Sequence, residues 1–190
     1  MNSPSSAPDP HRWERMGQSL QARTRIFDLL TVQYRHRGRA ITRDFVVIQA
    51  PGWVNVVAHT ADDHLVLVRQ FRFGINDLSL EIPGGVIESG EDPVAAGVRE
   101  LREETGYTGG AARLIGNVHP NPAIQSNHSH FVLVEGAVRS HEPEWDADEE
   151  IAVTLLPVRD VFAMARSGGI THGLVLNALW FFEPHWRRSR

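Results

Sequence analysis

The stretch PGGVIESGEDPVAAGVRELREETG, from Pro83 to Gly106, constrains this chain more than any other. Its second half predicts a helix over Glu91–Thr105. Glu91 and Asp92 place carboxylates where the positive end of a helix dipole favours them, and Pro93 suits a first helical turn. Gly106 suits the position just after the last helical residue. The sequence therefore places a short helix shortly after a Pro-Gly-Gly turn, where backbone without side chains can approach a metal or a phosphate.

Two faces of the expected helix differ in chemistry. At 100° per residue, one face is largely apolar and can pack on a sheet. Its residues are Val94, Val98, Leu101 and Thr105. Glu100, Glu103 and Glu104 project from another face, with Cβ atoms roughly 5–6 Å apart, so that their oxygens could share a hard divalent cation such as Mg²⁺. Taken alone, such a face is also typical of a solvated helix surface balanced by Arg99 and Arg102.

Composition limits the remaining classes of protein. The 190 residues carry a formal net charge of −4 and include no cysteine, which excludes disulfides, zinc–thiolate sites and cysteine nucleophiles. No apolar run reaches the roughly 18 residues of a membrane span, and the slightly acidic charge disfavours general nucleic-acid binding. We therefore expect a cytoplasmic protein without membrane or nucleic-acid partners. The polar, Pro- and Ser-rich residues 1–10 predict a disordered tail.

Strands dominate the rest of the chain. Residues 25–59 predict about three strands, punctuated by Gly38 and by Pro51-Gly52. A helix is expected over Val158–Arg166 and another over Thr171–Phe182, ending before Pro184. Further strands are expected at Leu65–Phe73, Leu78–Ile82, Ala112–Val118, His130–Val138 and Glu150–Pro157. This order indicates a mixed α/β layout without strict alternation of strand and helix.

The segment from Gly85 to Tyr107 reads G-x5-E-x7-R-E-L-x-E-E-x-G-Y. It resembles the signature of the Nudix hydrolases, which cleave a nucleoside diphosphate linked to another group. The seven fixed positions all match: Gly85, Glu91, Arg99, Glu100, Glu103, Glu104 and Gly106. Tyr107 departs from the aliphatic residue that usually ends the signature.

The resemblance implies an α/β/α sandwich around a mixed sheet, with a β-rich N-terminal extension. We expect the extension at residues 11–50, at a homodimer interface, and the Nudix domain at residues 51–190. The resemblance also implies that Glu100 and Glu104 are the main metal ligands, with Glu103 near them and the Gly84 carbonyl oxygen contributing. Arg99 would orient the glutamates, and the metal would be Mg²⁺, with Mn²⁺ as a substitute.

Features outside the signature indicate a branch of the family. The phrase LVLVRQFRFG…LEIPGG is similar to the ADP-ribose and nucleoside-diphosphate-sugar pyrophosphatases, and it implies that Arg72 contacts substrate phosphate. Pro122 lies sixteen residues after Gly106, as in that branch. Alternatively, Arg72 is a surface charge and the residues near Pro122 form an ordinary loop. The residues assigned to substrate binding are Arg72, Glu81, Asn121, Pro122, Ala123 and Asn127.

A general base is expected just before a late strand. By resemblance, Glu149 helps to hold metal and activates water, with Glu150 as the second choice; an acidic loop is the alternative. A histidine among His119, His128 and His130 is another candidate base, because its pKa lies near neutrality. We count Arg99 and Glu103 with Glu149 and Glu150 as catalytic residues.

These residues predict metal-assisted hydrolysis of the pyrophosphate bond of ADP-ribose or of a nucleotide sugar such as GDP-mannose. The products would be a nucleoside monophosphate and a sugar phosphate. One alternative is a hydrolase of modified nucleoside triphosphates or dinucleoside polyphosphates. The other is a nucleotide-sensing Nudix domain without catalysis.

Overall fold

The computed structural model describes residues 9–145 and 150–188. Contacts between Cα atoms divide the chain into two compact units. One unit comprises the residues up to Ala50 together with Asn121–Ser126, and the other comprises Pro51–Pro120 and Asn127–Arg190. Within the described residues, no helix is long and apolar enough to cross a membrane.

The larger unit contains a mixed seven-stranded sheet in the order β12-β5-β4-β10-β9, with β6 beside β5 and β7 beside β4. β4 and β10 run parallel, whereas the other neighbours run antiparallel. The strands are β4 Trp53–His59, β5 His64–Arg72, β6 Asp77–Glu81, β7 Gly84–Val86, β9 Ala111–Val118, β10 Ser129–Glu135 and β12 Ala152–Pro157. Short strands β8 Tyr107–Thr108 and β11 Val138–Arg139 pair separately.

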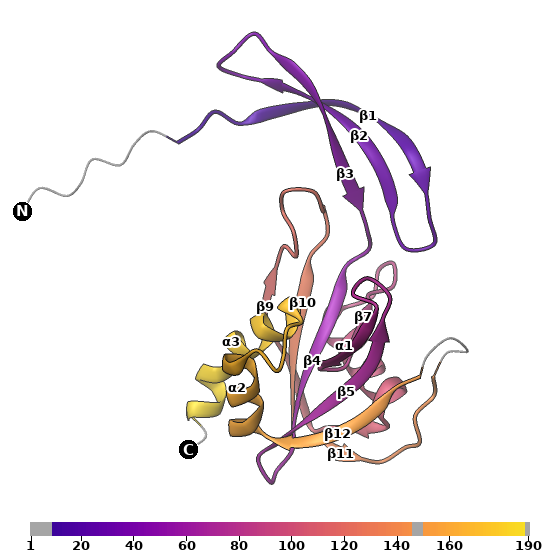
Figure 1. The fold of residues 1–190 in the computed structure, drawn as a ribbon, viewed down its shortest axis with the longest axis vertical. Helices are drawn as coiled ribbons and strands as arrows, with labels where there is room; N and C mark the ends of the chain where they lie inside the picture. The colour runs from indigo at the N-terminus through magenta and orange to yellow at the C-terminus, as the bar shows by residue number, and fades with distance from the viewer. Residues whose placement is uncertain (1–8, 146–149, 189–190) are drawn as a thin grey trace, which may run out of the picture. The chain divides into compact units, whose positions relative to one another are not determined.

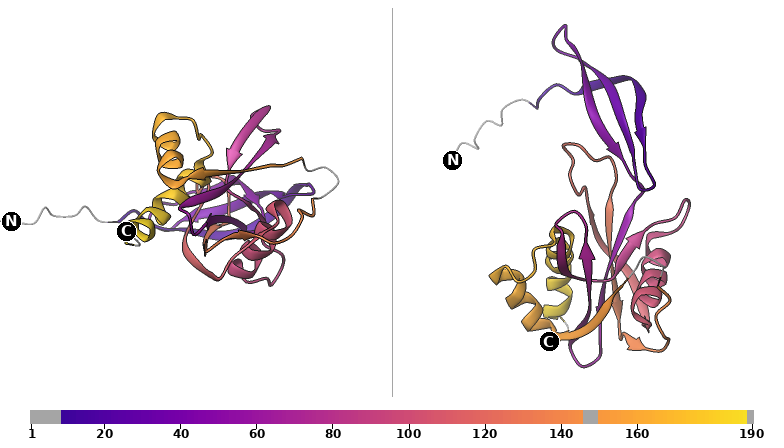
Figure 2. Two further views of the ribbon diagram at one scale, coloured as in Figure 1. Left: turned by 90° about the horizontal axis from the view of Figure 1, so that it is seen from below. Right: turned by 45° about the vertical axis from the view of Figure 1, so that its right-hand side comes forward.

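Helices cover both faces of this sheet (Figure 1, Figure 2). Helix α1, Pro93–Thr105, packs on one face against Val56 and its neighbours. Helices α2, Val158–Ser167, and α3, Gly173–Arg188, pack on the other face against Val57 and its neighbours. The alternation of side chains along β4 sends adjacent valines to opposite faces, so both faces are apolar. The expected α/β/α sandwich is confirmed.

The smaller unit is an antiparallel sheet of β1 Trp13–Arg23, β2 Asp28–His36 and β3 Thr42–Gln49. The loop 121–126 adds to its edge: Ile48 N–H donates to Ile124 O at 2.8 Å, and Ser126 N–H donates to Ile48 O at 3.1 Å. The sequence gives no sign of most of β1, because its side chains are almost all exposed and show no alternation. Its place in the sheet is set by its backbone pairing with β2.

Helix α1 differs from its prediction in two ways. It begins at Pro93, because the Asp92 side chain caps it by accepting from Val94 N–H at 2.9 Å and from Ala95 N–H at 3.1 Å. Glu91 therefore lies before the helix. Val98, predicted on the apolar face, is 38% exposed. The buried residues of the helix are Ala96, Gly97, Leu101, Glu104 and Thr105.

Small residues explain why α1 faces the sheet with Ala96 and Gly97 and not with Val98. A Cβ atom at Gly97 would lie 3.2 Å from side-chain atoms of Val54 and of Val132. The helix thus approaches the sheet along Ala96 and Gly97, and a larger residue on this face would separate them. The larger Val98 is turned away from the contact.

Helix α3 continues past Pro184, although it was predicted to end before it. Pro184 removes one backbone N–H, but packing and charge beyond it hold the last turn. The Trp186 ring stacks on Phe162 with centroids 5.2 Å apart, and Arg187 donates to Glu183 at 2.7 Å. These tertiary contacts therefore outweigh the tendency of Pro184 to end the helix.

The close contact of α1 with the sheet predicts a large effect of Gly97→Leu. The added side chain must push against Val54 and Val132. We expect the free energy of unfolding to fall by about 1–3 kcal/mol. Ala95→Leu, at an exposed position of the same helix, is the matched control and should change stability by less than about 0.5 kcal/mol. Urea unfolding of both variants measures the difference. Equal stabilities would contradict the close approach.

Candidate active site

Two glycines allow β7 to lie between β4 and α1. Gly84 pairs with Asn55 of β4, and a side chain at Gly84 would overlap the Val54 carbonyl oxygen. A side chain at Gly85 would overlap the carboxylate of Glu100. Backbone atoms of the Pro-Gly-Gly turn therefore contact the acidic face of the helix directly, as only glycine permits.

Glu104 is 5% exposed and belongs to this contact. Its Oε2 accepts a hydrogen bond from Gly84 N–H at 3.0 Å. Its backbone carbonyl accepts from the Trp145 indole N–H at 2.8 Å. A carboxylate buried at this depth must be satisfied by donors or by cations, and the amide of the glycine turn supplies one donor.

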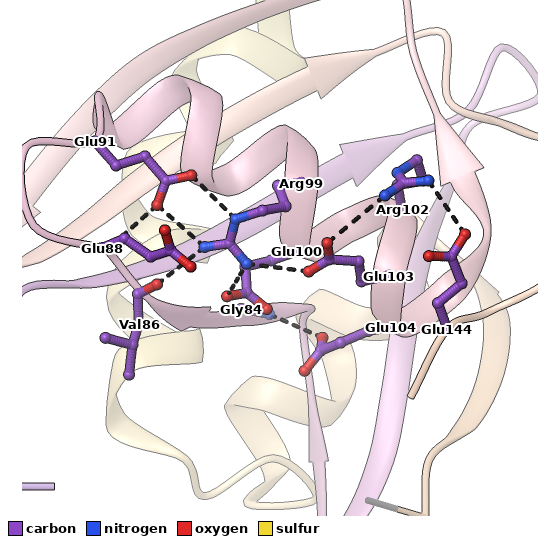
Figure 3. A network of polar contacts seen from close by, with 10 residues as sticks. All are labelled: Gly84, Val86, Glu88, Glu91, Arg99, Glu100, Arg102, Glu103, Glu104 and Glu144. Atoms are coloured by element: carbon purple, nitrogen blue, oxygen red, sulfur yellow. Dashed lines mark hydrogen bonds and ion pairs between the residues drawn. The ribbon is translucent and has the colours of Figure 1, made fainter. Parts of the chain in front are cut away.

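Arg99 joins the helix to the loop before it (Figure 3). Its guanidinium donates to both oxygens of Glu91, at 3.0 and 3.1 Å, and to Val86 O at 3.1 Å. Nη1 donates to Glu100 at 2.9 Å and to Glu103 at 3.0 Å. One planar cation thereby fixes three carboxylates and a carbonyl, which the five donors of a guanidinium allow and an ammonium does not.

The same contacts shift the proton affinities of the network. Hydrogen bonding to Glu91, together with the contacts to Glu100 and Glu103, outweighs burial and raises the pKa of Arg99 above its ordinary value. Hydrogen bonds from Arg99 and from Glu88 N–H hold the pKa of Glu91 below its ordinary value. Both directions keep these groups charged at neutral pH.

The three glutamates of the helix do not all meet at one point. Glu100 and Glu103 converge on Arg99, whereas Glu104 points to Gly84 (Figure 3). Among the described residues, no group of three or more His, Asp or Glu side chains is already arranged to hold a metal ion. Glu100 and Glu104 nevertheless lie one helical turn apart, each against a glycine of the turn. This all-oxygen donor set fits Mg²⁺ or Mn²⁺.

A second polar pair lies in β5 and β6. Arg72 Nε and Nη2 donate to the two oxygens of Glu81 at 2.7 and 2.6 Å. Glu81 is 2% exposed. Burial raises the pKa of Glu81, but the hydrogen bonds and charge of Arg72, together with His172 and a hydrogen bond from Ser79, outweigh it, so the pKa lies below its ordinary value. Glu81 precedes Gly84 by three residues, a span of at most about 11 Å between Cα atoms. The pair is therefore near the glycine turn.

The other residues expected to bind substrate lie in two settings. Asn121, Pro122 and Ala123 are exposed in the loop that joins the smaller unit. Asn127 is buried; its amide donates to Pro51 O at 3.1 Å, and its Oδ1 has no hydrogen-bond partner among the described residues. Substrate could reach Asn127 only after this contact opened.

The expected bases are placed only in part. Glu150 is exposed, and Glu149 lies outside the described residues. The rings of His119 and His128 lie 4.0 Å apart, and burial lowers the pKa of His130. The two rings are tilted by 44° to each other.

His172 was not predicted as a site residue, yet its Nε2 lies 3.7 Å from Glu81 Oε2. It comes directly before α3, far from Glu81 along the chain, and stands in the loop GGITHG. No spacing rule connects a single histidine in such a loop to a strand of the sheet. Only the tertiary fold reveals this neighbour.

The sequence of the chain is similar to those of known proteins. Residues 51–175 match the model of the NUDIX domain. The chain is 33% identical over 147 residues to "ADP-ribose pyrophosphatase" of Bacillus subtilis, covering 77% of this chain and 78% of that protein. It is 36% identical over 120 residues to "ADP-sugar pyrophosphatase" of Mus musculus, covering 60% of this chain and 55% of the mouse protein.

A solved structure described as an ADP compounds hydrolase superposes with a TM-score of 0.83 at 19% identity, covering 96% of this chain and 98% of that one. At this identity the likeness concerns the fold. The family match, the B. subtilis relative and the intact set of signature residues together carry the assignment. The chain belongs to the Nudix family of pyrophosphohydrolases.

Proposed function

We propose that the chain hydrolyses the pyrophosphate bond of ADP-ribose or of a closely related ADP-sugar. The observation that carries the proposal is the placement of Glu100 and Glu104 against the bare backbone of Gly84 and Gly85. The names of the B. subtilis and mouse relatives support an ADP-linked sugar as the substrate. ADP-ribose and one water would give AMP and ribose 5-phosphate.

We assign metal binding to Glu100 and Glu104, with Glu103 beside them and the Gly84 carbonyl as a further ligand. This combination of carboxylates and a backbone oxygen suits Mg²⁺, or Mn²⁺ in its place. When bound, such an ion offsets charge on the phosphate oxygens and lowers the pKa of the attacking water. Glu100 would bind the ion in place of its contact with Arg99, whose guanidinium is also bound by Glu91 and Val86.

Other side chains of this chain position the substrate and move the proton. Arg72, held by Glu81, would contact a substrate phosphate through charge-assisted hydrogen bonds. Glu149 or, second, Glu150 would accept the proton of the attacking water. Asn121, Pro122 and Ala123 remain proposed contacts to the sugar or the base.

A substrate panel tests the proposed reaction. With Mg²⁺, we expect ADP-ribose to be cleaved faster than GDP-mannose, UDP-glucose, diadenosine polyphosphates or nucleoside triphosphates. Chromatography and mass spectrometry should identify AMP and ribose 5-phosphate as the only products of ADP-ribose. Preferred release of inorganic pyrophosphate from triphosphates, or of two nucleotides from dinucleotides, would contradict the proposed substrate class.

Glu104→Gln tests the assignment of metal ligands. The amide oxygen of glutamine can still accept from Gly84 N–H, but the negative charge is lost. We expect kcat on ADP-ribose to fall roughly 100- to 1,000-fold, with little change in the thermal unfolding midpoint. Glu144→Gln removes an exposed carboxylate that pairs with Arg102 at 3.2 Å and should alter kcat by less than about twofold. Wild-type turnover by Glu104→Gln at saturating Mg²⁺ would refute the assignment.

We also propose that the N-terminal sheet, β1–β3, forms a homodimer interface. Its strands leave several large apolar side chains exposed, and a three-stranded sheet is stable when an apolar face is covered. Trp13 and Phe45 contact each other edge to face, with centroids 5.6 Å apart. The exposed apolar residues of these strands are Trp13, Met16, Leu20, Phe45 and Val46.

Light scattering after size-exclusion chromatography tests the dimer. Phe45→Glu places a charge among the exposed apolar residues, and we expect the molar mass to fall from that of two chains toward the 21.3 kDa of one. Val138→Glu, at an exposed apolar strand position outside this sheet, should leave the mass unchanged. A wild-type chain that elutes as a monomer at micromolar concentration would rule out the proposal.

A further inference from the structure

His172 contacts the Arg72–Glu81 pair from a third element of the fold. Its Nε2 lies 3.7 Å from Glu81 Oε2, and its side chain is 27% exposed. It occupies the turn just before α3, and its carbonyl accepts from Leu176 N–H at 3.2 Å in the first turn of that helix. The start of α3 thereby fixes the position of the imidazole beside Glu81.

Glu81 has little freedom of its own. Both of its oxygens accept from Arg72, the Ser79 side chain also hydrogen-bonds to it, and the residue is almost fully buried. A buried carboxylate interacts with the polar groups around it in place of water. A change in one of these groups therefore alters how strongly the carboxylate binds the others. The orientation of Arg72 therefore depends on the other polar groups at Glu81, which are His172 and the Ser79 side chain.

The pKa of the His172 imidazole lies below its ordinary value, a direction that favours the neutral ring at pH 7. Burial lowers its pKa, and Arg72 acts in the same direction, whereas Glu81 opposes them. A neutral imidazole carries one N–H. We assign it to Nε2, because this nitrogen faces the Glu81 carboxylate, whereas Nδ1 is buried without a hydrogen-bond partner among the described residues. At 3.7 Å the contact is longer than a hydrogen bond and acts through charge and dipole.

The unpartnered Nδ1 argues against a purely structural role. A buried acceptor without a donor destabilises the folded state, and an apolar side chain of similar size would avoid that penalty. Histidine at this position is thus a poor choice for packing alone. A role in the substrate site accounts for its presence, because its polar ring faces the Glu81 carboxylate at 3.7 Å, which an apolar side chain cannot provide.

We propose that His172 is a positioning residue of the substrate site, which holds Glu81 and through it orients Arg72 toward a phosphate of the substrate. The inference rests on the proposed pyrophosphatase function. It adds a residue from the start of α3 to the site, and it assigns that residue a role in substrate affinity rather than in the chemical step.

Two substitutions separate this role from a structural one. His172→Leu removes the polar ring that faces Glu81 and also the unpartnered nitrogen. We expect its unfolding temperature to equal or exceed that of the wild type, while KM for ADP-ribose rises about tenfold, a typical coupling between contacting residues. Because the proton transfers are untouched, kcat should stay within about twofold. His172→Gln places an amide near the Nε2 position and should recover most of the lost affinity.

A matched histidine and a double-mutant cycle complete the test. His185→Leu changes a partly buried histidine at the other end of α3 and should leave KM unchanged. In an Arg72→Ala background, adding His172→Leu should raise KM no further, because the group that His172 orients is absent. Additive effects, or a lower unfolding temperature with an unchanged KM, would overturn the role of His172 alone. Absence of wild-type turnover on every nucleoside diphosphate would overturn the proposed function and this inference with it.

Discussion

The contacts of Arg99 are the constraint on which the acidic site depends. Three glutamates on neighbouring turns of one helix repel one another, and a sheet packed against the helix excludes part of the water that would screen them. Arg99 offsets this repulsion by binding Glu100 and Glu103 together. Its other edge binds Glu91 and Val86, so it also fixes the loop that precedes the helix. The local charge balance and the local backbone are thus set by one side chain.

Small residues bring this charged helix close enough to the sheet for its carboxylates to reach the backbone. Gly97 allows α1 to approach Val54 and Val132, and Gly85 allows β7 to touch the Glu100 carboxylate. Because β7 also pairs with β4, the glycine turn is held from both sides. Glu104 can therefore be buried with its charge facing a backbone donor. The contact between α1 and the glycine turn therefore both packs the helix and stabilises the charge of Glu104.

Much of this arrangement could be predicted from residue spacing, because it is local. The spacing of Glu100 and Glu103 predicts that they lie side by side, as their shared contact with Arg99 shows, and Gly106 predicts the end of the helix, where φ is 72°. Which residues of the helix face the sheet could not be predicted. Val98 is more apolar than Gly97, and only the close contact with the valines of the sheet determines that Gly97 is the buried one of the two. Likewise, Pro184 predicts a helix end that the stacking of Trp186 on Phe162 overrides.

Contacts between distant segments escaped sequence reasoning for the same physical reason. β1 carries no apolar alternation, because its pairing with β2 is a backbone interaction. His172 has no local motif, and its proximity to Glu81 arises from the way α3 meets the sheet. Arg72 and Glu81 were each anticipated as site residues, but their bidentate contact follows from the pairing of β5 with β6.

We infer that the acidic face of α1 and the glycine turn form one cation site. Diffraction from crystals soaked in Mn²⁺ and a non-hydrolysable ADP-ribose analogue tests this inference through the anomalous signal of manganese. We expect a peak within coordination distance of the carboxylates of Glu100 and Glu104, with Arg99 still bound to Glu91. A peak elsewhere on the protein, or none while Glu100 remains on Arg99, would contradict it.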